Sequence, residues 1–240
     1  MILIKAMNNN RGIYERYVKR ILDVLLSGGF IIAFCWIYFL LAFFVGRNLG
    51  RPVLFTQLRP GKGEKIFRMF KFRSMTNATD ANGKLLPDED RLPPFGEKLR
   101  STSLDELPEL FNILRGEMSI VGPRPQLVRD MVFMTDEQRR RHSVRQGLTG
   151  LAQVSGRNGI DWDERLKLDV EYVDNITFIG DMKIIFKTVK AVFIKDGVQT
   201  EGMATSEDLG DYLLRLGRVS KEEYQEKQIE AKFMVQKCEM

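Results

Sequence analysis

The chain has 240 residues, 44% hydrophobic and 29% charged, which is enough for one or two domains with a buried core. Its 37 basic and 32 acidic side chains give a formal net charge of +5, which favours an anionic partner: a membrane surface, nucleotide phosphates or nucleic acid. Cys35 and Cys238 lie far apart, and with a single histidine they exclude a disulfide framework and a zinc site. The sequence holds no RNA-binding or helix-turn-helix pattern, so we expect no nucleic acid partner.

An uncharged apolar run from Val24 to Val45 follows a short polar and basic arm, residues 1–17. The run reaches the roughly 20 residues of a membrane helix and lacks the cleavage site of a signal peptide. Basic residues flank both of its ends, and the positive-inside rule would place both flanks in the cytoplasm. A re-entrant helical hairpin satisfies this rule and a spanning helix does not, while a long buried core helix is the least favoured alternative. We therefore expect membrane lipids as a partner.

Residues 50–75 are predicted to form two strands joined by a turn. Apolar residues at Val53 to Phe55 precede turn chemistry at Pro60-Gly61. From Lys65 to Arg73 charged and apolar residues mostly alternate, which indicates a half-buried strand. Its charged face is either a solvated edge or a basic wall for a pyrophosphate or an anionic lipid. The polar segment 76–94 after it is predicted to be a loop and is a candidate cover for the site.

The stretch from Ser103 to Pro125 holds the candidate chemistry. Two adjacent acids, Asp105 and Glu106, precede apolar residues at helical spacing, and Gly116 ends that run as a helix stop should. Arg124 lies between two prolines, which fix the backbone on both of its sides. An acid pair at a helix start and a rigidly mounted arginine suit a site that handles phosphate.

The two acids also have a structural interpretation. Ser103 and Glu106 fit a capping box, in which acids near a helix start stabilise it in any protein. If instead Pro108 is the first helical residue, the acids lie in the turn before the helix and are free to face a ligand.

The second half of the chain is predicted to be mostly helical. Residues 136–145 are basic, and Arg139-Arg140-Arg141 faces either lipid head groups or plain solvent. His142 in the same segment is expected to be a solvated surface residue. The glycine-rich segment 147–159 is expected to bring backbone N–H groups and Arg157 to a nucleotide.

Helices are expected over 161–172 and 178–194, the second with the lysines of an interfacial helix. The charged tail, 205–240, is expected to be a helix that either associates with a second copy as a homodimer or is solvated.

The run from Leu104 to Pro125 closely resembles the bacterial sugar transferase family, the small monotopic phosphoglycosyl transferases. Further matches in the same order are Lys19-Arg20-Ile21-Leu22-Asp23, Pro52-Val53-Leu54-Phe55-Thr56-Gln57, Lys71-Phe72-Arg73-Ser74-Met75, residues 147–158 and residues 168–173. The resemblance implies an α+β protein, with a membrane helix that enters the inner leaflet and returns, and a small cytosolic α/β catalytic domain with interfacial helices. Its expected parts are a membrane hairpin at 18–47, the catalytic domain at 48–204 and the tail.

The resemblance also implies the reaction and the roles of the site residues. Asp105 would be the nucleophile, Glu106 would hold Mg²⁺, and Arg124 would bind phosphate or nucleotide. The enzyme would transfer a sugar 1-phosphate from a UDP-sugar to polyprenyl (undecaprenyl) phosphate through a phosphosugar-aspartate, releasing UMP, at the cytoplasmic face of the bacterial inner membrane. We further expect Lys71, Arg73 and Arg157 to bind substrate. A magnesium-dependent lipid-diphosphate hydrolase and a membrane scaffold without chemistry are the alternatives.

The membrane segment departs from the family pattern. Cys35-Trp36 stands where family members usually carry a Ser-Pro break, so the bend should come from Ser27-Gly28-Gly29 or be absent. Asp23, at the edge of the apolar run, is expected either to act as an acid at a helix N-terminus or to pair with Arg20. Gln146 stands where the family usually has proline, and we expect only a local backbone effect from it.

Overall fold

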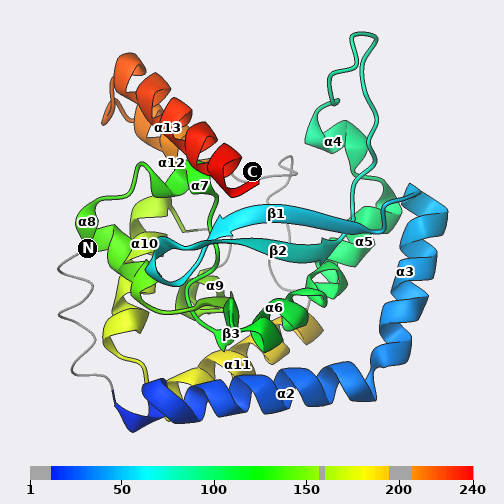
Figure 1. Cartoon of the computed structure of the whole chain (residues 1–240), viewed down its shortest axis with the longest axis vertical. Coiled ribbons are helices and arrows are strands. Elements are labelled where there is room, and N and C mark those ends of the chain that lie inside the picture. Colours follow the sequence, from blue (N-terminus) through cyan, green and yellow to red (C-terminus); the bar gives the residue numbers. More distant parts are fainter. Residues whose placement is uncertain (1–11, 157–159, 195–206, 240) are drawn as a thin grey trace.

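The computed structural model describes residues 12–156, 160–194 and 207–239. The described chain is α+β, with two two-stranded sheets among helices (Figure 1). The N-terminal elements are η2 (Tyr14–Val18), α2 (Lys19–Ala33), α3 (Cys35–Leu49), β1 (Leu54–Pro60), η3 (Lys62–Glu64) and β2 (Ile66–Phe72). The middle holds α4 (Asp88–Arg91), α5 (Pro94–Ser101), η4 (Leu104–Glu106), α6 (Glu109–Arg115), β3 (Met118–Val121), α7 (Val128–Met131), α8 (Asp136–Arg139), η5 (Arg140–Ser143) and β4 (Gln146–Thr149). The remaining helices are α9 (Leu151–Ser155), α10 (Trp162–Asp174), α11 (Phe178–Ile194), α12 (Leu209–Arg215) and α13 (Lys221–Glu239).

The apolar run forms two helices that bend by 66° at Phe34. The prediction that Ser27-Gly28-Gly29 supplies the bend is therefore wrong, because these residues lie inside α2. The bend falls beside Cys35-Trp36, where the family carries its break. Phe34 leaves the helical region at φ −116° and ψ 21°, with no proline needed.

Tertiary contacts set the direction that α3 takes after the bend. The Tyr38 hydroxyl donates to the carbonyl of Leu107 at 3.0 Å, which ties the first turns of α3 to the segment before α6. Further along α3, Val45 and Leu49 are buried against Phe72. No single helix in the described part of the chain is long and apolar enough to cross a membrane, although the bent pair together reaches that length and composition.

Helix α2 is bonded to α6 and β3 by its polar side chains. Arg20 donates to the carbonyl oxygens of Ile113 and Leu114 at 2.6 and 2.9 Å, at the C-terminal end of α6 where a cation is favourable. Asp23 does not pair with Arg20 and does not lie in the first turn of α2. It is buried, and its Oδ1 accepts a hydrogen bond from the backbone N–H of Ile120 in β3 at 2.9 Å.

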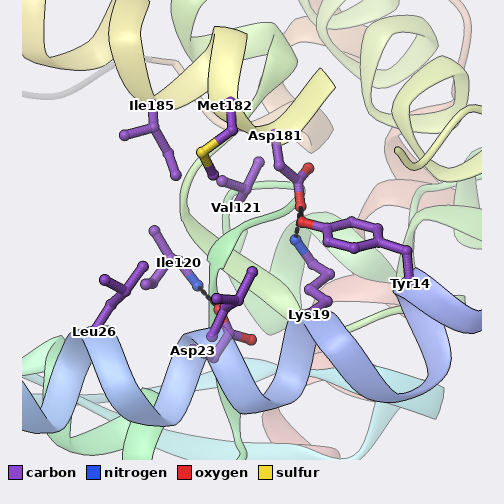
Figure 2. Close-up of a pocket in the computed structure, with 10 residues that line it drawn as sticks. Tyr14, Lys19, Asp23, Leu26, Ile120, Val121, Asp181, Met182 and Ile185 are labelled. Carbon is purple, nitrogen blue, oxygen red and sulfur yellow. Dashed lines mark hydrogen bonds and ion pairs between the residues drawn. The ribbon is translucent and has the colours of Figure 1, made fainter. Parts of the chain in front are cut away.

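A second polar contact joins the start of the chain to α11 (Figure 2). The Tyr14 hydroxyl donates to Asp181 Oδ2 at 2.6 Å, and Lys19 forms an ion pair with the same oxygen. The Tyr172 hydroxyl of α10 donates to Asp181 Oδ1 at 2.8 Å. Because Asp181 is 2% exposed, this contact fixes α2 and α11 side by side.

The predicted pair of strands is confirmed. β1 and β2 are antiparallel, with Leu54 opposite Phe72 and Pro60 opposite Ile66. Side chains alternate between the two faces, so Lys71 and Arg59 share one face of the hairpin. The segment after it, predicted to be a loop, also contains α4 and stands away from the rest of the molecule in Figure 1.

The acids lie in the turn before α6. Asp105 and Glu106 belong to the 3-10 turn η4, and Pro108 is the N-cap of α6. Ser103 has a left-handed backbone (φ 54°) and makes no capping hydrogen bond, so the capping box does not form. Gly116 ends α6 at φ 83°, the left-handed conformation that glycine adopts most easily.

The basic segment with Arg139-Arg140-Arg141 is not an exposed helix throughout. Arg141 and His142 are both 0% exposed, so the prediction of a solvated His142 is wrong. The first arginine of the run donates to both carboxylate oxygens of Glu64 at 2.7 and 2.8 Å, and the third donates to Asp169. The segment is buried because carboxylates from the hairpin tip and from α10 receive its arginines.

The β3 and β4 strands pair in parallel, and β3 leads into the loop that carries Arg124. A Cβ on Gly147 would lie 2.1 Å from the backbone nitrogen of Gly122, so only glycine allows this approach. Gln146 is fully buried, and its Nε2 donates to the carbonyl of Arg141 at 3.1 Å.

The C-terminal helices α12 and α13 pack on α7 and α10. The backbone N–H of Leu209 donates to Asp130 Oδ1 at 3.0 Å, and Trp162 Nε1 donates to the carbonyl of Glu207 at 2.9 Å. Leu209 and Ala231 are buried in one apolar cluster with Trp162. The predicted tail is helical, but it is not simply solvated.

Candidate active site

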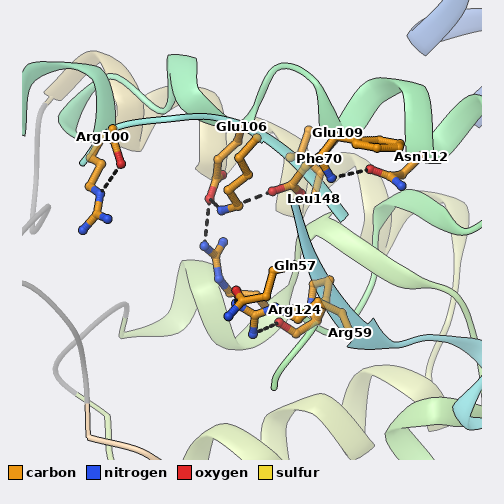
Figure 3. Close-up of polar contacts among 12 residues, drawn as sticks. Gln57, Arg59, Phe70, Arg100, Glu106, Glu109, Asn112, Arg124 and Leu148 are labelled. Carbon is orange, nitrogen blue, oxygen red and sulfur yellow. Dashed lines mark hydrogen bonds and ion pairs between the residues drawn. The ribbon is translucent and has the colours of Figure 1, made fainter. Parts of the chain in front are cut away.

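Three segments of the chain meet at the predicted acid pair (Figure 3). The turn η4 carries Asp105 and Glu106, strand β2 brings Lys71, and the loop after β3 brings Arg124. The structure thus brings four of the predicted site residues together from three separate parts of the sequence.

Glu106 is the centre of a compact charge network. Its Oε1 accepts hydrogen bonds from Lys71 Nζ at 2.8 Å and from Arg124 Nη2 at 2.7 Å. Burial alone would raise the pKa of Glu106, but the charges of Arg124 and Lys71 outweigh it and hold that pKa well below its usual range. Glu106 is therefore an anion at neutral pH, and it fixes both cations.

Asp105 lies beside this network without bonding to it. Its side chain is 7% exposed, and within the described ranges its carboxylate makes no hydrogen bond or ion pair. Burial and then the charge of Glu106 raise the pKa of Asp105 to about 6. A carboxylate with neither a full water shell nor a protein partner is well suited to attack an electrophile.

Glu109 is a third acid of the site, and the sequence analysis did not include it. Its Oε1 lies 3.2 Å from Lys71 Nζ, and it is 2% exposed. Burial raises the pKa of Glu109 to about 7, against the opposing charge of Lys71. The signal was its position three residues after Glu106, which places both side chains on one side of a helical turn.

If Asp105 attacks as a carboxylate, as the resemblance implies, activity is expected to fall as the pH drops through about 6, because the pKa of Asp105 is raised to about 6 from 3.8. The pH profile of kcat/KM, between about pH 5 and about pH 9, measures this limb. The limb should persist in Glu109→Gln. If it disappears in that variant, Glu109 and not Asp105 is the group that titrates.

A buried ion pair between Arg141 and Asp169 contacts the backbone of Arg124. Arg141 Nη2 donates to the carbonyl oxygen of Arg124 at 2.5 Å, and Arg141 Nε donates to Asp169 Oδ2 at 2.9 Å. Arg141 is 0% exposed and Asp169 is 1% exposed. The position of Arg124 therefore depends on η5 and α10 as well as on its two flanking prolines.

The sequence pattern of the family described as bacterial sugar transferase matches residues 14–195, which include every residue of this charge network. The chain belongs to the bacterial sugar transferase family. The resemblance found in the sequence is thereby confirmed, and the protein is an enzyme of the phosphoglycosyl transferase class.

Several proteins are similar to this sugar transferase. It is 44% identical over 191 residues to the uncharacterised sugar transferase EpsL of Bacillus subtilis, which covers 79% of this chain and 94% of EpsL. It is 36% identical over 214 residues to the undecaprenyl-phosphate galactose phosphotransferase of Salmonella typhimurium, covering 82% of this chain and 45% of that protein. It is 38% identical over 194 residues to the undecaprenyl-phosphate glucose phosphotransferase of Komagataeibacter xylinus, covering 74% and 36%. The sugar transferase thus spans nearly all of EpsL but less than half of the two phosphotransferases.

Other predicted site residues of this sugar transferase lie away from the charge network. Arg73 is 7% exposed, and its Nη1 donates to the carbonyl of Arg51 at 3.2 Å. Ser27 is buried in α2, while Cys35 and Trp36 are exposed at the start of α3. Arg157 lies outside the described residues. The substrate-binding roles of the two arginines stay predictions.

Proposed function

We propose that this sugar transferase moves a sugar 1-phosphate from a UDP-sugar to undecaprenyl phosphate, through a covalent phosphosugar-aspartate and with release of UMP. The observation that carries the proposal is the buried, unbonded carboxylate of Asp105 beside Glu106, which two cations neutralise. The relatives support the substrate classes: two are named for undecaprenyl phosphate, and one from Erwinia amylovora is named UDP-galactose-lipid carrier transferase.

In the first step a carboxylate oxygen of Asp105 attacks the phosphorus that carries the sugar. An acyl-phosphate bond forms, the bond from that phosphorus to the bridging oxygen breaks, and UMP leaves with the electron pair. Lys71 and Arg124 lie within hydrogen-bond distance of Glu106, so two positive charges are already in place beside the developing negative charge.

In the second step a phosphate oxygen of undecaprenyl phosphate attacks the same phosphorus. The acyl-phosphate bond breaks, the lipid diphosphate sugar forms, and Asp105 is regenerated as a carboxylate. Splitting the transfer lets a water-soluble donor and a membrane-bound acceptor use one small site in turn.

We expect Mg²⁺ as the cofactor, and the residues fit it in part. No group of three Asp, Glu, His or Cys side chains among the described residues is placed to hold a metal. Mg²⁺ usually takes only one or two protein carboxylates, with substrate phosphates supplying further ligands. Glu106, whose Oε2 makes no hydrogen bond within the described ranges, would hold the ion beside Asp105. When bound, the ion neutralises the diphosphate and stabilises the leaving UMP.

The surface formed by α2, α3 and α11 supports attachment to a membrane at the cytoplasmic face. Exposed apolar side chains far beyond the few that a soluble surface carries mark a contact with lipid or protein. The most exposed of these side chains are Ile21, Leu25, Ile32, Trp36, Phe39, Phe43, Ile179 and Phe186. Helix α11, which carries Ile179 and Phe186, also carries several lysines, as an interfacial helix does. Helix α3 of this surface also contacts the segment beside the acids, through the hydrogen bond from Tyr38 to Leu107.

UMP release by the detergent-solubilised chain tests the proposal, with a panel of UDP-sugars, Mg²⁺, and undecaprenyl phosphate either present or absent. We expect continuous UMP release from one sugar only with the lipid, loss of it in EDTA, and recovery with excess Mg²⁺. Continuous release without lipid would make the protein a hydrolase, and no release from any sugar would contradict the donor class. Full activity in EDTA would remove Glu106 from a metal role.

A further inference from the structure

Arg59, near the end of β1, is a cation of this site that no step above uses. It lies on the same face of the hairpin as Lys71. Its Nη1 donates to the carbonyl of Pro125 at 3.2 Å, and its Nη2 donates to Gln57 Oε1 at 2.7 Å. Figure 3 shows Arg59 and Gln57 beside Arg124, across from the acids.

Arg59 is partly buried and lacks a carboxylate partner. Within the described ranges no Asp or Glu oxygen lies within 4.0 Å of it, and its Nε is buried without a hydrogen bond. Two of the five N–H groups of a guanidinium are used and the Nε–H is enclosed, which leaves one N–H on each Nη for a ligand. Burial, and next the charge of Arg124, lower the pKa of Arg59 to about 10.

Neighbouring arginines of the same region are paired with acids. Arg124 bonds to Glu106, Arg129 to Asp208 and Arg141 to Asp169. A charge that is partly withdrawn from water without an acid partner is costly, so a ligand that supplies the opposite charge would be favourable there. Arg59 and Arg124 together place two guanidinium groups at one loop with a single neutralising carboxylate, which is a binding place for a phosphate group.

We propose that Arg59 and Arg124 form a subsite for the phosphate that Asp105 does not attack. In the first step this is the nucleotide phosphate of the donor, which leaves as UMP. In the second step it is the phosphate of the polyprenyl acceptor, which enters the same place. The subsite rests on the proposed two-step transfer, and it explains how a nucleotide and a lipid with no other common chemistry use one site.

Arg59→Gln tests the subsite in the full chain, with UMP and undecaprenyl phosphate as the two probes. We expect inhibition by UMP to weaken by about 10- to 100-fold and the KM for undecaprenyl phosphate to rise by a similar factor, because a hydrogen bond to a charged group is lost. Arg59→Lys keeps the charge but lacks the planar guanidinium, so its UMP inhibition and lipid KM should lie between those of the wild type and of Arg59→Gln. Arg129→Gln removes the same charge from an exposed pair nearby and should change both values less than about twofold.

The outcomes separate this subsite from the proposed function. A wild-type chain that releases no UMP from any UDP-sugar contradicts the transfer reaction itself. An active wild type whose Arg59→Gln variant keeps both values overturns the subsite, and a change in UMP inhibition alone overturns its sharing with the lipid. If Arg59→Gln unfolds at a lower temperature, Arg59→Lys decides, since normal UMP inhibition and lipid KM in that variant would contradict recognition by the guanidinium.

Discussion

Asp105→Asn is expected to abolish sugar phosphate transfer and at the same time to make the protein more stable. An amide cannot form the acyl-phosphate, so we expect turnover to fall by at least roughly a thousandfold. The side chain is 7% exposed, has no protein partner among the described residues, and has a pKa raised to about 6 by burial and then by Glu106. At neutral pH the charge of Asp105 is therefore unfavourable in the folded protein, and asparagine removes it.

The stability gain should depend on pH in a defined direction. The pKa of Asp105 is 3.8 when unfolded and about 6 when folded, so the folded state holds this proton more tightly, and stability is lost as the pH rises through about 6. Asparagine removes this loss, which is worth at most roughly 3 kcal/mol at neutral pH, falls to about 1 kcal/mol near pH 4.5 and vanishes only below the unfolded pKa of 3.8. Thermal unfolding of both proteins at about pH 8 and about pH 4.5 measures it, and we expect the variant to be several degrees more stable at the higher pH and to keep only about a third of that gain at the lower pH.

The matched control for this variant is Asp90→Asn, the same chemical change at an exposed acid of α4. It should alter neither transfer nor unfolding temperature. Near-normal transfer by Asp105→Asn would contradict its role as the nucleophile. A lower unfolding temperature at both pH values would contradict the account of its burial.

Arg141→Met is expected to cause the largest loss of stability and a loss of transfer as well. Arg141 and Asp169 form an ion pair with almost no exposure, and removing one partner strands the other charge. Breaking such a pair costs about 3–5 kcal/mol, which lowers the unfolding temperature by roughly 10 °C. The same change removes the hydrogen bond to the carbonyl of Arg124, so phosphate binding should weaken too.

Arg141→Met combined with Asp169→Asn separates the two effects. The double variant has no stranded charge, so much of the lost stability should return, while transfer stays low because Arg124 still lacks its support. Thermal unfolding and UMP release on the same preparations give both values. A single variant that unfolds within about 2 °C of the wild type, or a double variant with normal transfer, would show that the pair does not position Arg124.

The elements that the sequence predicts well are those with local causes. The hairpin from Leu54 to Phe72 has alternation and turn chemistry of its own, and α10 and α11 show helical periodicity. Asp105, Glu106 and Arg124 could be grouped as one candidate site because one continuous motif contains all three, and the structure places them together. The bend at Phe34 was missed because the direction of α3 is set by contacts with residues far away in the sequence, such as that of Tyr38 with Leu107.

The buried arginine segment shows why long-range pairing could not be predicted. His142 and its neighbours look like a solvated basic face, since charged residues are rarely fully buried unless paired. Their partners, Glu64 and Asp169, lie 75 and 28 residues from the arginines that they bind. A single sequence gives no signal that links residues so far apart. Arg59 was missed for a related reason, because the lack of an acid partner near its guanidinium can be seen only in the folded structure.

The packing of α12 and α13 shows that the folded unit extends beyond the residues that match the family. The family match ends at residue 195, yet Leu209 and Ala231 complete an apolar cluster with Trp162 and Met131 inside the matched region. A fragment cut where the match ends would expose that cluster to water and leave the Asp130 carboxylate without one of its two backbone donors. Expression work and domain swaps between relatives should therefore keep the last two helices with the catalytic part, as one inseparable unit.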